Sequence, residues 1–367
     1  MLKNRLFILL LGFVIILAAL IYKDRKPGVS YTETIKIGAI LPLSGDFSSA
    51  GEEINRGAQI AVKEYKDKGY NINYIVEDDQ FDSVKMVSAA QKLTQADKVD
   101  AVFGAAGEEA RPTGQIFNKA KVPLLIGWDS NEELKTSGNY IFTIGFTSEA
   151  NAKKTADFAY TDLGLRKMAI LGHIDPVADV LADTFSKEFS SLGGQIVLRD
   201  RVQVSTKDFR SYITKMKADG AEGVYFIFLP PSNEVFLKQA DQLNLNAKLF
   251  GADAVQDYEI KDGSDAAEGL YYSSIFTEKP EEMKKKYKEM FGEETGNPSF
   301  VSVGYDSAVT LTEAKIKAIK NNTTVTEALK NLKTNATTFP VNMNGGNFSE
   351  RVEKIFQVKD GKSVEVK

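Results

Sequence analysis

Short apolar runs alternate with stretches of helical periodicity along most of this chain. Residues 35–43 (IKIGAILPL) predict a buried strand, and the apolar positions between residues 50 and 69 recur at helical spacing until Gly69 ends the helix. Further strands are predicted at 71–79, 99–106, 122–128 and 139–145, with helices from residue 82 and over 108–120. This alternation is typical of a mostly parallel sheet that helices cover on both faces.

The same alternation starts again with an amphipathic helix at residues 148–160. The strands that follow are predicted at 167–173, 195–204, 223–229, 248–253 and 269–276, and the helices at 177–192, 208–219 and 233–243. The fold class is therefore α/β, with two doubly wound, Rossmann-like units at about 35–146 and 147–274.

The rest of the chain returns as helices at 280–291, 300–320 and 324–333. Thr324 and Glu327 have the spacing of a capping box and mark the start of the last helix. The tail alternates apolar and polar residues around Asp360-Gly361, which predicts a β-hairpin with a type I′ turn.

The N-terminus has the pattern of a membrane-targeting segment. Lys3 and Arg5 precede an uncharged apolar run over residues 6–22, and a second basic cluster follows at 23–26. At about 1.5 Å per residue this run has the length of a short membrane span. We expect an uncleaved signal-anchor over residues 1–26 and a polar linker over 27–34. A cleaved signal peptide is the alternative, and a buried core helix is a third.

Composition excludes several classes of function. The 367 residues contain 46 Lys+Arg and 50 Asp+Glu, for a net charge of -4, so the basic excess of a nucleic-acid-binding protein is missing. There are no cysteines, which excludes disulfides, thiolate metal sites and an N-terminal lipidated cysteine. One histidine cannot form a multi-histidine metal centre.

Signatures of catalysis are absent as well. The chain has no phosphate-binding G-x-x-x-x-G-K loop, no dinucleotide fingerprint and no nucleophile elbow. His173 ends a predicted strand and is expected to be a satisfied residue at a strand tip rather than a base. Acidic pairs such as those at 77–79 and 108–109 are typical of solvated loops. We therefore expect no enzyme, no cofactor and no metal site.

In open α/β sheets, ligands bind beyond the carboxyl ends of the strands, where helix N-termini also gather. The candidate loops are 43–47, 105–109, 127–131, 174–178, 229–233 and 252–256. Two lobes joined by several crossings would place these loops around one cleft, which describes a clamshell that closes by a hinge around a small solute.

Long segments of the chain strongly resemble one known family. The resemblance begins with IKIGAILPLSGDFSSAGEEINRGAQIAVKEYKDKG and continues through VEDDQFDSVKMVSAAQKLTQADKVDAVFGAAG, VPLLIGWDSNEEL, KMAILGH, DAAEGLYYSSIF and GYDSAVTLTEA. This sequence resembles the type I periplasmic solute-binding proteins of ABC importers, in the branched-chain amino-acid class. The likeness covers nearly everything from residue 35 onward and is specific for fold and role, but not for the ligand.

The resemblance implies an extracytoplasmic receptor that closes around a small amino-acid-like, amide or cationic solute and delivers it to an ABC permease. It implies a soluble portion that is monomeric, and a cell-membrane location with the N-terminal helix as anchor and the binding domain outside. Hinge crossings are expected near 146, 275 and 338, so that lobe 1 holds 35–146 and 276–337 and lobe 2 holds 147–275 and 338–367. The alternative is a ligand sensor for a separate signalling partner.

The family's binding residues carry over unevenly. Glu108 stands where amino-acid binders have a hydroxyl that holds the ligand carboxylate, and Asp129 and Ser130 occupy the next loop. Val177 stands where an aromatic side chain often stacks on the ligand, and Asp253 matches the acidic residue that binds the ligand amine.

The first loop contributes Ser44 and Phe47 to the expected site. Trp128 either lines the cleft or packs under it, and Tyr305 and Asp306 are expected to pack near the hinge. Carboxylates at 108, 129 and 253 favour a solute with cationic or multiple N–H donor character. The other possibility is an ordinary amino-acid site in which Glu108 or Asp129 points to solvent.

Overall fold

The computed structural model describes residues 33–45, 47–130, 134, 136–229, 231–252, 265–274, 277–349 and 354–367. The expected membrane anchor over residues 1–26 lies outside this set. Within the described ranges, no helix has both the length and the apolar character that crossing a membrane requires.

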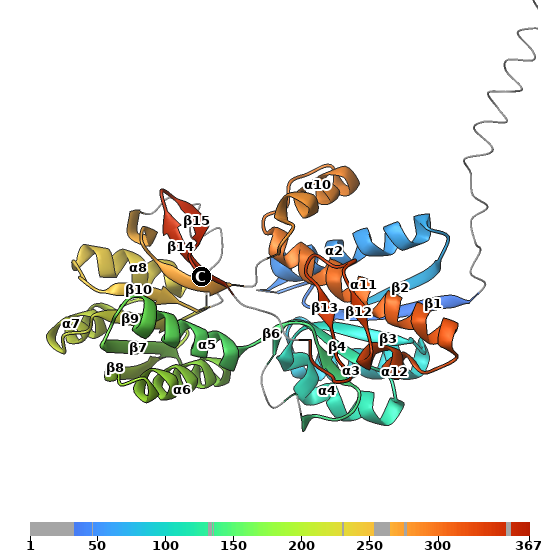
Figure 1. The fold of residues 1–367 in the computed structure, drawn as a ribbon, viewed down its shortest axis with the longest axis horizontal. Coiled ribbons are helices and arrows are strands. Elements are labelled where there is room, and N and C mark those ends of the chain that lie inside the picture. The colour runs from blue at the N-terminus through green and yellow to red at the C-terminus, as the bar shows by residue number, and fades with distance from the viewer. Residues whose placement is uncertain are drawn as a thin grey trace, which may run out of the picture.

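Two separate sheets form the frame of the molecule (Figure 1). The first has the order β2-β1-β3-β4-β5, and the short β6 also pairs with β4. All its pairings are parallel, as the strand–helix alternation predicts. The strands are β1 (Thr34–Leu41), β2 (Asn71–Asp78), β3 (Ala101–Ala106), β4 (Leu124–Ser130), β5 (Ile141–Thr143) and β6 (Phe146–Thr147).

The second sheet has the order β15-β14-β11-β10-β9-β7-β8. Five of its strands are parallel, and the C-terminal hairpin of β14 and β15 adds to β11 in antiparallel fashion. Asp360 and Gly361 both have positive φ at the hairpin turn, which confirms the expected type I′ turn. The strands are β7 (Lys167–His173), β8 (Gln195–Val202), β9 (Gly223–Ile227), β10 (Lys248–Gly251), β11 (Tyr271–Ser274), β14 (Lys354–Lys359) and β15 (Lys362–Glu365).

Helices cover both faces of each sheet. Apolar side chains of α2 and α11 pack on one face of the first sheet and those of α3 and α4 on the other, while α7 with α8 and α5 with α6 do the same for the second. The helices are α2 (Ser48–Asp67), α3 (Ser83–Gln91), α4 (Gly107–Ala120), α5 (Ser148–Asp157), α6 (Pro176–Ser191), α7 (Arg210–Ala218), α8 (Ser232–Gln242), α10 (Pro280–Phe291), α11 (Pro298–Asn321) and α12 (Val325–Lys330). The Thr324–Glu327 capping box is present at α12.

The molecule has two lobes with separate cores. Among the described residues, none of the hydrophobic clusters draws side chains from both sheets. The chain leaves the first lobe between β6 and α5, returns between β11 and α10, and leaves it again before β14. Figure 1 shows the lobes side by side, with β6 between them.

The chain crosses from the first lobe to the second for the last time at a later residue than the sequence predicts. A boundary near 338 assigns the following residues to lobe 2, but Thr338 donates to the buried Asp306 of α11 from its backbone N–H and its hydroxyl, each at 2.6 Å. Val341 and Met343 are buried in the first core, and Ser349 donates to the Thr143 carbonyl of β5. The described residues up to 349 therefore remain with the first lobe.

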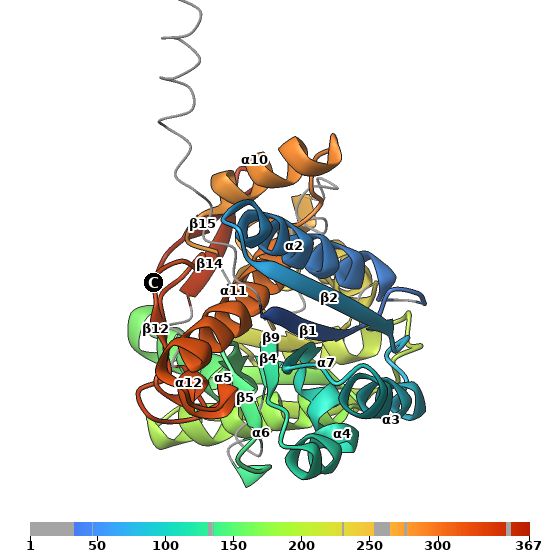
Figure 2. The same cartoon turned by 90° about the vertical axis from the view of Figure 1, so that its right-hand side faces the viewer.

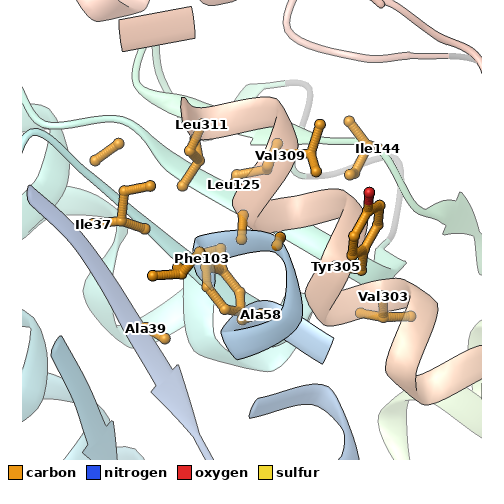
Figure 3. Close-up of a cluster of buried hydrophobic side chains, with 14 of the residues drawn as sticks. Ile37, Ala39, Ala58, Phe103, Leu125, Ile144, Val303, Tyr305, Val309 and Leu311 are labelled. Carbon is orange, nitrogen blue, oxygen red and sulfur yellow. The ribbon is translucent and has the colours of Figure 1, made fainter. Parts of the chain in front are cut away.

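The long helix α11 runs through the first core against α2 and the sheet (Figure 3). Val303, Val309 and Leu311 of α11 face a layer that includes Phe103 and Leu125 of the strands. The two helices approach so closely that a Cβ added at Gly304 would lie 1.7 Å from the Ile54 carbonyl oxygen, and one at Gly57 would lie 1.9 Å from that of Val301. Glycine is therefore required at this crossing.

Replacing Gly304 with alanine is expected to lower the free energy of unfolding by about 3 kcal/mol, because two backbones must separate to admit the methyl group. Gly114→Ala is the matched control, since its added Cβ meets only Ile141 at 3.8 Å and alanine is the better helix former. Urea unfolding followed by circular dichroism measures both. Equal stabilities of the two variants would contradict the close crossing.

Candidate functional site

The residues expected to bind a ligand lie where strands end. Ser44 and Phe47 follow β1, Glu108 lies in the first turn of α4 directly after β3, and Asp129 and Ser130 end β4. Because the strands of this sheet are parallel, their carboxyl ends share one edge of the first lobe. Val177 lies at the corresponding edge of the second lobe, in the first turn of α6. Asp253 follows β10 and lies outside the described residues.

Ser44 is held by the carboxylate that ends β2. Its hydroxyl donates to Asp78 Oδ2 at 2.6 Å, and its backbone N–H donates to Asp78 Oδ1 at 3.3 Å. Leu43 and Gln80 donate their N–H groups to the same carboxylate. Burial acts to raise the pKa of Asp78, but these donors outweigh it and hold the pKa below its ordinary value. Since its proton is directed at Asp78, the Ser44 hydroxyl offers only oxygen lone pairs to a further partner.

Phe47 lies at the surface against a second ring. Its centroid is 4.7 Å from that of Phe81, at an interplanar angle of 41°, and each side chain is 38% exposed. Such a pair contributes about 0.5–1.5 kcal/mol beyond its burial. The two rings come from the turns after β1 and β2, so they form an exposed aromatic platform at the edge of the sheet.

The turn that carries Phe81 is strained. Gln80 and Phe81 have φ of 53° and 56°, in the left-handed region that costs about 1–2 kcal/mol per non-glycine residue. Asp79 Oδ1 accepts the Phe81 N–H at 3.0 Å, and the Asp82 N–H donates to the Asp79 carbonyl at 2.8 Å. Asp82 in turn caps α3 by accepting from the backbone N–H groups of Val84 and Lys85. The left-handed turn is thus held by Asp79 before it and by Asp82 after it.

Asp79 is a buried carboxylate beside this turn. It is 0% exposed, and its Oδ2 has no hydrogen-bond partner among the residues that the structure describes. Burial is the main cause that raises its pKa, and the neighbouring charge of Asp78 adds to the rise. Adjacent carboxylates at the end of one strand therefore have pKa values displaced in opposite directions.

The backbone at the β3–β4 edge brings the other expected residues together. Ala106 at the end of β3 pairs with Asp129, and Ser130 pairs with Thr147 of β6. Helix α4 begins at Gly107 without an intervening loop, so its first N–H groups lie at this edge. A helix N-terminus favours a negative ligand group such as a carboxylate.

In the second lobe, Val177 is half-buried at the start of α6. Asp175 Oδ1 accepts the N–H groups of Val177 and Ala178 at 2.9 and 3.1 Å, so the chain itself caps this helix. Val177 packs against the core between α5, α6 and the sheet. It therefore contributes only an aliphatic side chain to the edge.

His173 is a buried strand-tip residue, but the expectation that it is satisfied is only half met, because its Nε2 has no hydrogen-bond partner among the described residues. It is 1% exposed, packs against Phe228 at 5.0 Å, and its Nδ1 accepts the Leu229 N–H at 3.2 Å. Burial lowers its pKa, although nearby Asp175 opposes the change, so the ring is neutral. A neutral, buried imidazole here fits a structural role.

Trp128 and Asp306 both stabilise the first lobe. Trp128 is partly buried and meets Phe300 of α11 edge-on at 4.4 Å, and Asp306 is buried beneath Thr338. Asp78, Asp79 and Phe81 were not predicted as site residues, because acidic pairs are typical of solvated loops. The signal was that both aspartates end the predicted strand 71–79, which places them at the carboxyl edge.

The periplasmic binding protein family matches residues 34–362. The chain belongs to this family. An amino acid binding protein of Pseudomonas aeruginosa is 26% identical over 232 residues, which is 62% of this chain and 62% of that protein, so the match spans less than two thirds of the relative. The family is one of solute-binding proteins rather than enzymes.

Two solved structures share the fold. LivJ of Streptococcus pneumoniae, a branched-chain amino acid transporter substrate-binding protein in complex with isoleucine, has a TM-score of 0.78 at 21% identity and covers 91% of this chain and 100% of its own. A solute-binding protein of an ABC transporter from Rhodopseudomonas palustris BisB5, in complex with 3,4-dihydroxybenzoic acid, has a TM-score of 0.77 at 23% identity, with 91% and 96% covered. These structures confirm the expected α/β fold with parallel sheets. The resemblance to the branched-chain class is confirmed by Leu/Ile/Val-binding protein homolog 6 of Brucella abortus, which is 27% identical over 310 residues, 80% of this chain and 78% of that protein.

The two aspartates after β2 are expected to respond oppositely to replacement by asparagine. A raised folded pKa stabilises the protein below the unfolded value of about 3.9 and loses that effect as pH rises through the folded pKa. Asp79→Asn should therefore gain stability relative to the parent protein at pH 7, and the gain should shrink as pH falls.

Asp78→Asn should lose about 1 kcal/mol at pH 7, because the amide removes the negative charge and the second oxygen, which accepts the Ser44 hydroxyl. This loss of stability should become smaller as pH falls below the ordinary pKa of an aspartate. A carboxylate with a depressed folded pKa stabilises the protein only above that ordinary value. Urea unfolding across pH measures both variants. If Asp79→Asn lost as much as Asp78→Asn, the assignment of a buried, unpaired carboxylate to Asp79 would be wrong.

Proposed function

We propose that this protein is the extracytoplasmic substrate-binding receptor of an ABC importer. It closes around a small amino-acid-like, amide or cationic solute and delivers it to a membrane permease. The observation that carries this proposal is a pair of lobes with separate cores, joined by three passages of the chain. In each lobe the parallel strands end at one edge. Independent cores allow the lobes to move as rigid bodies about those passages.

The first lobe supports a solute that both donates hydrogen bonds and carries a carboxylate. Ser44 offers an acceptor because its proton is committed to Asp78. The N-terminus of α4 offers N–H groups to a negative group. We also assign the carboxylates of Glu108, Asp129 and Asp253 to solute binding. Together these groups favour an amino-acid-like compound with an additional cationic or N–H donor group over a neutral branched-chain amino acid.

The location and partner follow from this role. We assign the binding lobes to the outside of the cell membrane and residues 1–26 to a signal-anchor that tethers them. The partner is the permease of an ABC importer, to which the solute-loaded lobes dock as a monomer.

A thermal-shift screen of the full chain in detergent tests the receptor role. The panel consists of the twenty amino acids, primary amides, polyamines and aromatic acids. A compound at about 100 times its Kd adds about 2.7 kcal/mol to the free energy of unfolding and raises Tm by several degrees. We expect the largest shift from a basic or amide-bearing amino acid. No shift from any member of these four classes would contradict the proposed solute.

Asp253→Ala is expected to abolish the shift caused by an amine-bearing compound, because it removes the carboxylate that pairs with the ligand amine. Asp183→Ala is the control, since Asp183 is 69% exposed on α6, pairs with Arg199, and should bind as the parent protein does. Titration calorimetry with the compound of largest shift measures both affinities. Equal affinity of the two variants would remove Asp253 from the site.

A further inference from the structure

Exposed apolar side chains follow strands on each lobe, apart from Ile319 of α11 and Val364 of β15, which are exposed elsewhere. The first rim consists of Phe47, Phe81 and Val84, whose exposed fractions are 38%, 38% and 74%. The second rim consists of Ile174 and Val204, at 47% and 51%. Single exposed apolar side chains are common on protein surfaces, whereas several grouped at one strand edge mark a contact surface.

The two rims occupy equivalent positions in the sheets. The first rim follows β1 and β2, and β2 is the outermost strand of the order β2-β1-β3-β4-β5. The second follows β7 and β8, and β8 is the outermost strand beside β7 and β9. The Ile174 N–H donates to the Val202 carbonyl at 2.8 Å, which places Ile174 beside the end of β8. Both rims therefore stand at carboxyl ends.

The chain passages lie at the opposite ends of both strand orders. β6, which leads into the second lobe, pairs with β4, and the other passages leave from β11 and enter at β14. Figure 2 shows β14 and β15 at the left and β1 and β2 towards the right. A hinge at the passages therefore opens the lobes on the side of β2 and β8, where the rims are.

The first rim is held in place by its turn. Phe81 adopts the left-handed conformation that bulky side chains rarely enter, and Asp79 fixes it through the Phe81 N–H. The ring is thereby set against Phe47 at the surface rather than folded into the core.

We propose that the two rims are partners, and that Phe47, Phe81 and Val84 close on Ile174 and Val204 as an apolar clasp when the lobes shut. This inference rests on the proposed function, because it requires hinge closure. The contact exists only in the closed state, so it shifts the equilibrium towards that state.

Disulfide trapping tests the clasp directly, because the chain contains no cysteine. The full chain in detergent carries Phe81→Cys with Val204→Cys, and it is oxidised with copper-phenanthroline in the absence of any solute. The control pairs Val204→Cys with Ile319→Cys, because Ile319 is similarly exposed at 39% but lies near the C-terminal end of α11. We expect the rim pair to form an intramolecular disulfide at least tenfold faster than the control.

A second rim pair guards against a defect caused by the loss of the Phe81 ring. Val84→Cys with Val204→Cys changes only strongly exposed side chains, so its fold should be intact. Rates of both rim pairs equal to the control overturn the clasp. Disulfide-linked dimers formed faster than the intramolecular bond also overturn it, and assign the rims to contact between two copies.

Failure of the clasp is distinguishable from failure of the receptor role. Trapping needs no solute, whereas the receptor role is measured by thermal shifts with named compounds. Slow trapping in a protein that shows a thermal shift rejects the clasp alone. Fast trapping without any shift retains the clasp and rejects the proposed solute.

Discussion

The parallel direction of the strands is the constraint on which the rest of the structure depends. Helices cover both faces of each sheet, so the faces are filled by core side chains and only the strand ends remain for chemistry. Parallel strands bring their carboxyl ends to one edge together with the helix N-termini. That edge collects Ser44, Asp78 and the start of α4 in the first lobe, and Asp175 and His173 in the second.

The first-lobe edge combines rigidity with unfavourable local features. Asp78 is charged and accepts several donors, whereas its neighbour Asp79 is buried, with one oxygen unpaired among the described residues. The turn that follows holds two residues at positive φ and exposes a phenylalanine. The buried carboxylate of Asp79, the left-handed backbone and the exposed ring each cost free energy that a simple turn would avoid. Their common result is the fixed position of Phe81 and Ser44, which is consistent with a surface shaped for closure rather than for stability.

Periodicity predicted the fold well because strand and helix spacing depend on local pattern alone. The hairpin at Asp360-Gly361 and the capping box at Thr324 followed from short motifs with one structural solution. The passage near 338 was misplaced because it depends on tertiary contacts, chiefly the buried Asp306 with Thr338. The roles of Asp79 and Phe81 could not be predicted either, because residue type alone does not show that a carboxylate is buried or that a backbone is left-handed. The ligand contacts of Glu108, Asp129, Ser130 and Asp253 stay predictions.

Hydrogen–deuterium exchange of the full chain, with and without the compound of largest thermal shift, tests the central claim that solute binds between the carboxyl edges of both lobes. Binding there should slow exchange at residues 42–47 and 107–111 of the first lobe and at 174–178 of the second. No change is expected at the opposite edge, represented by residues 68–70 and 97–100. Protection confined to one lobe, or located at the opposite edge, would contradict the account.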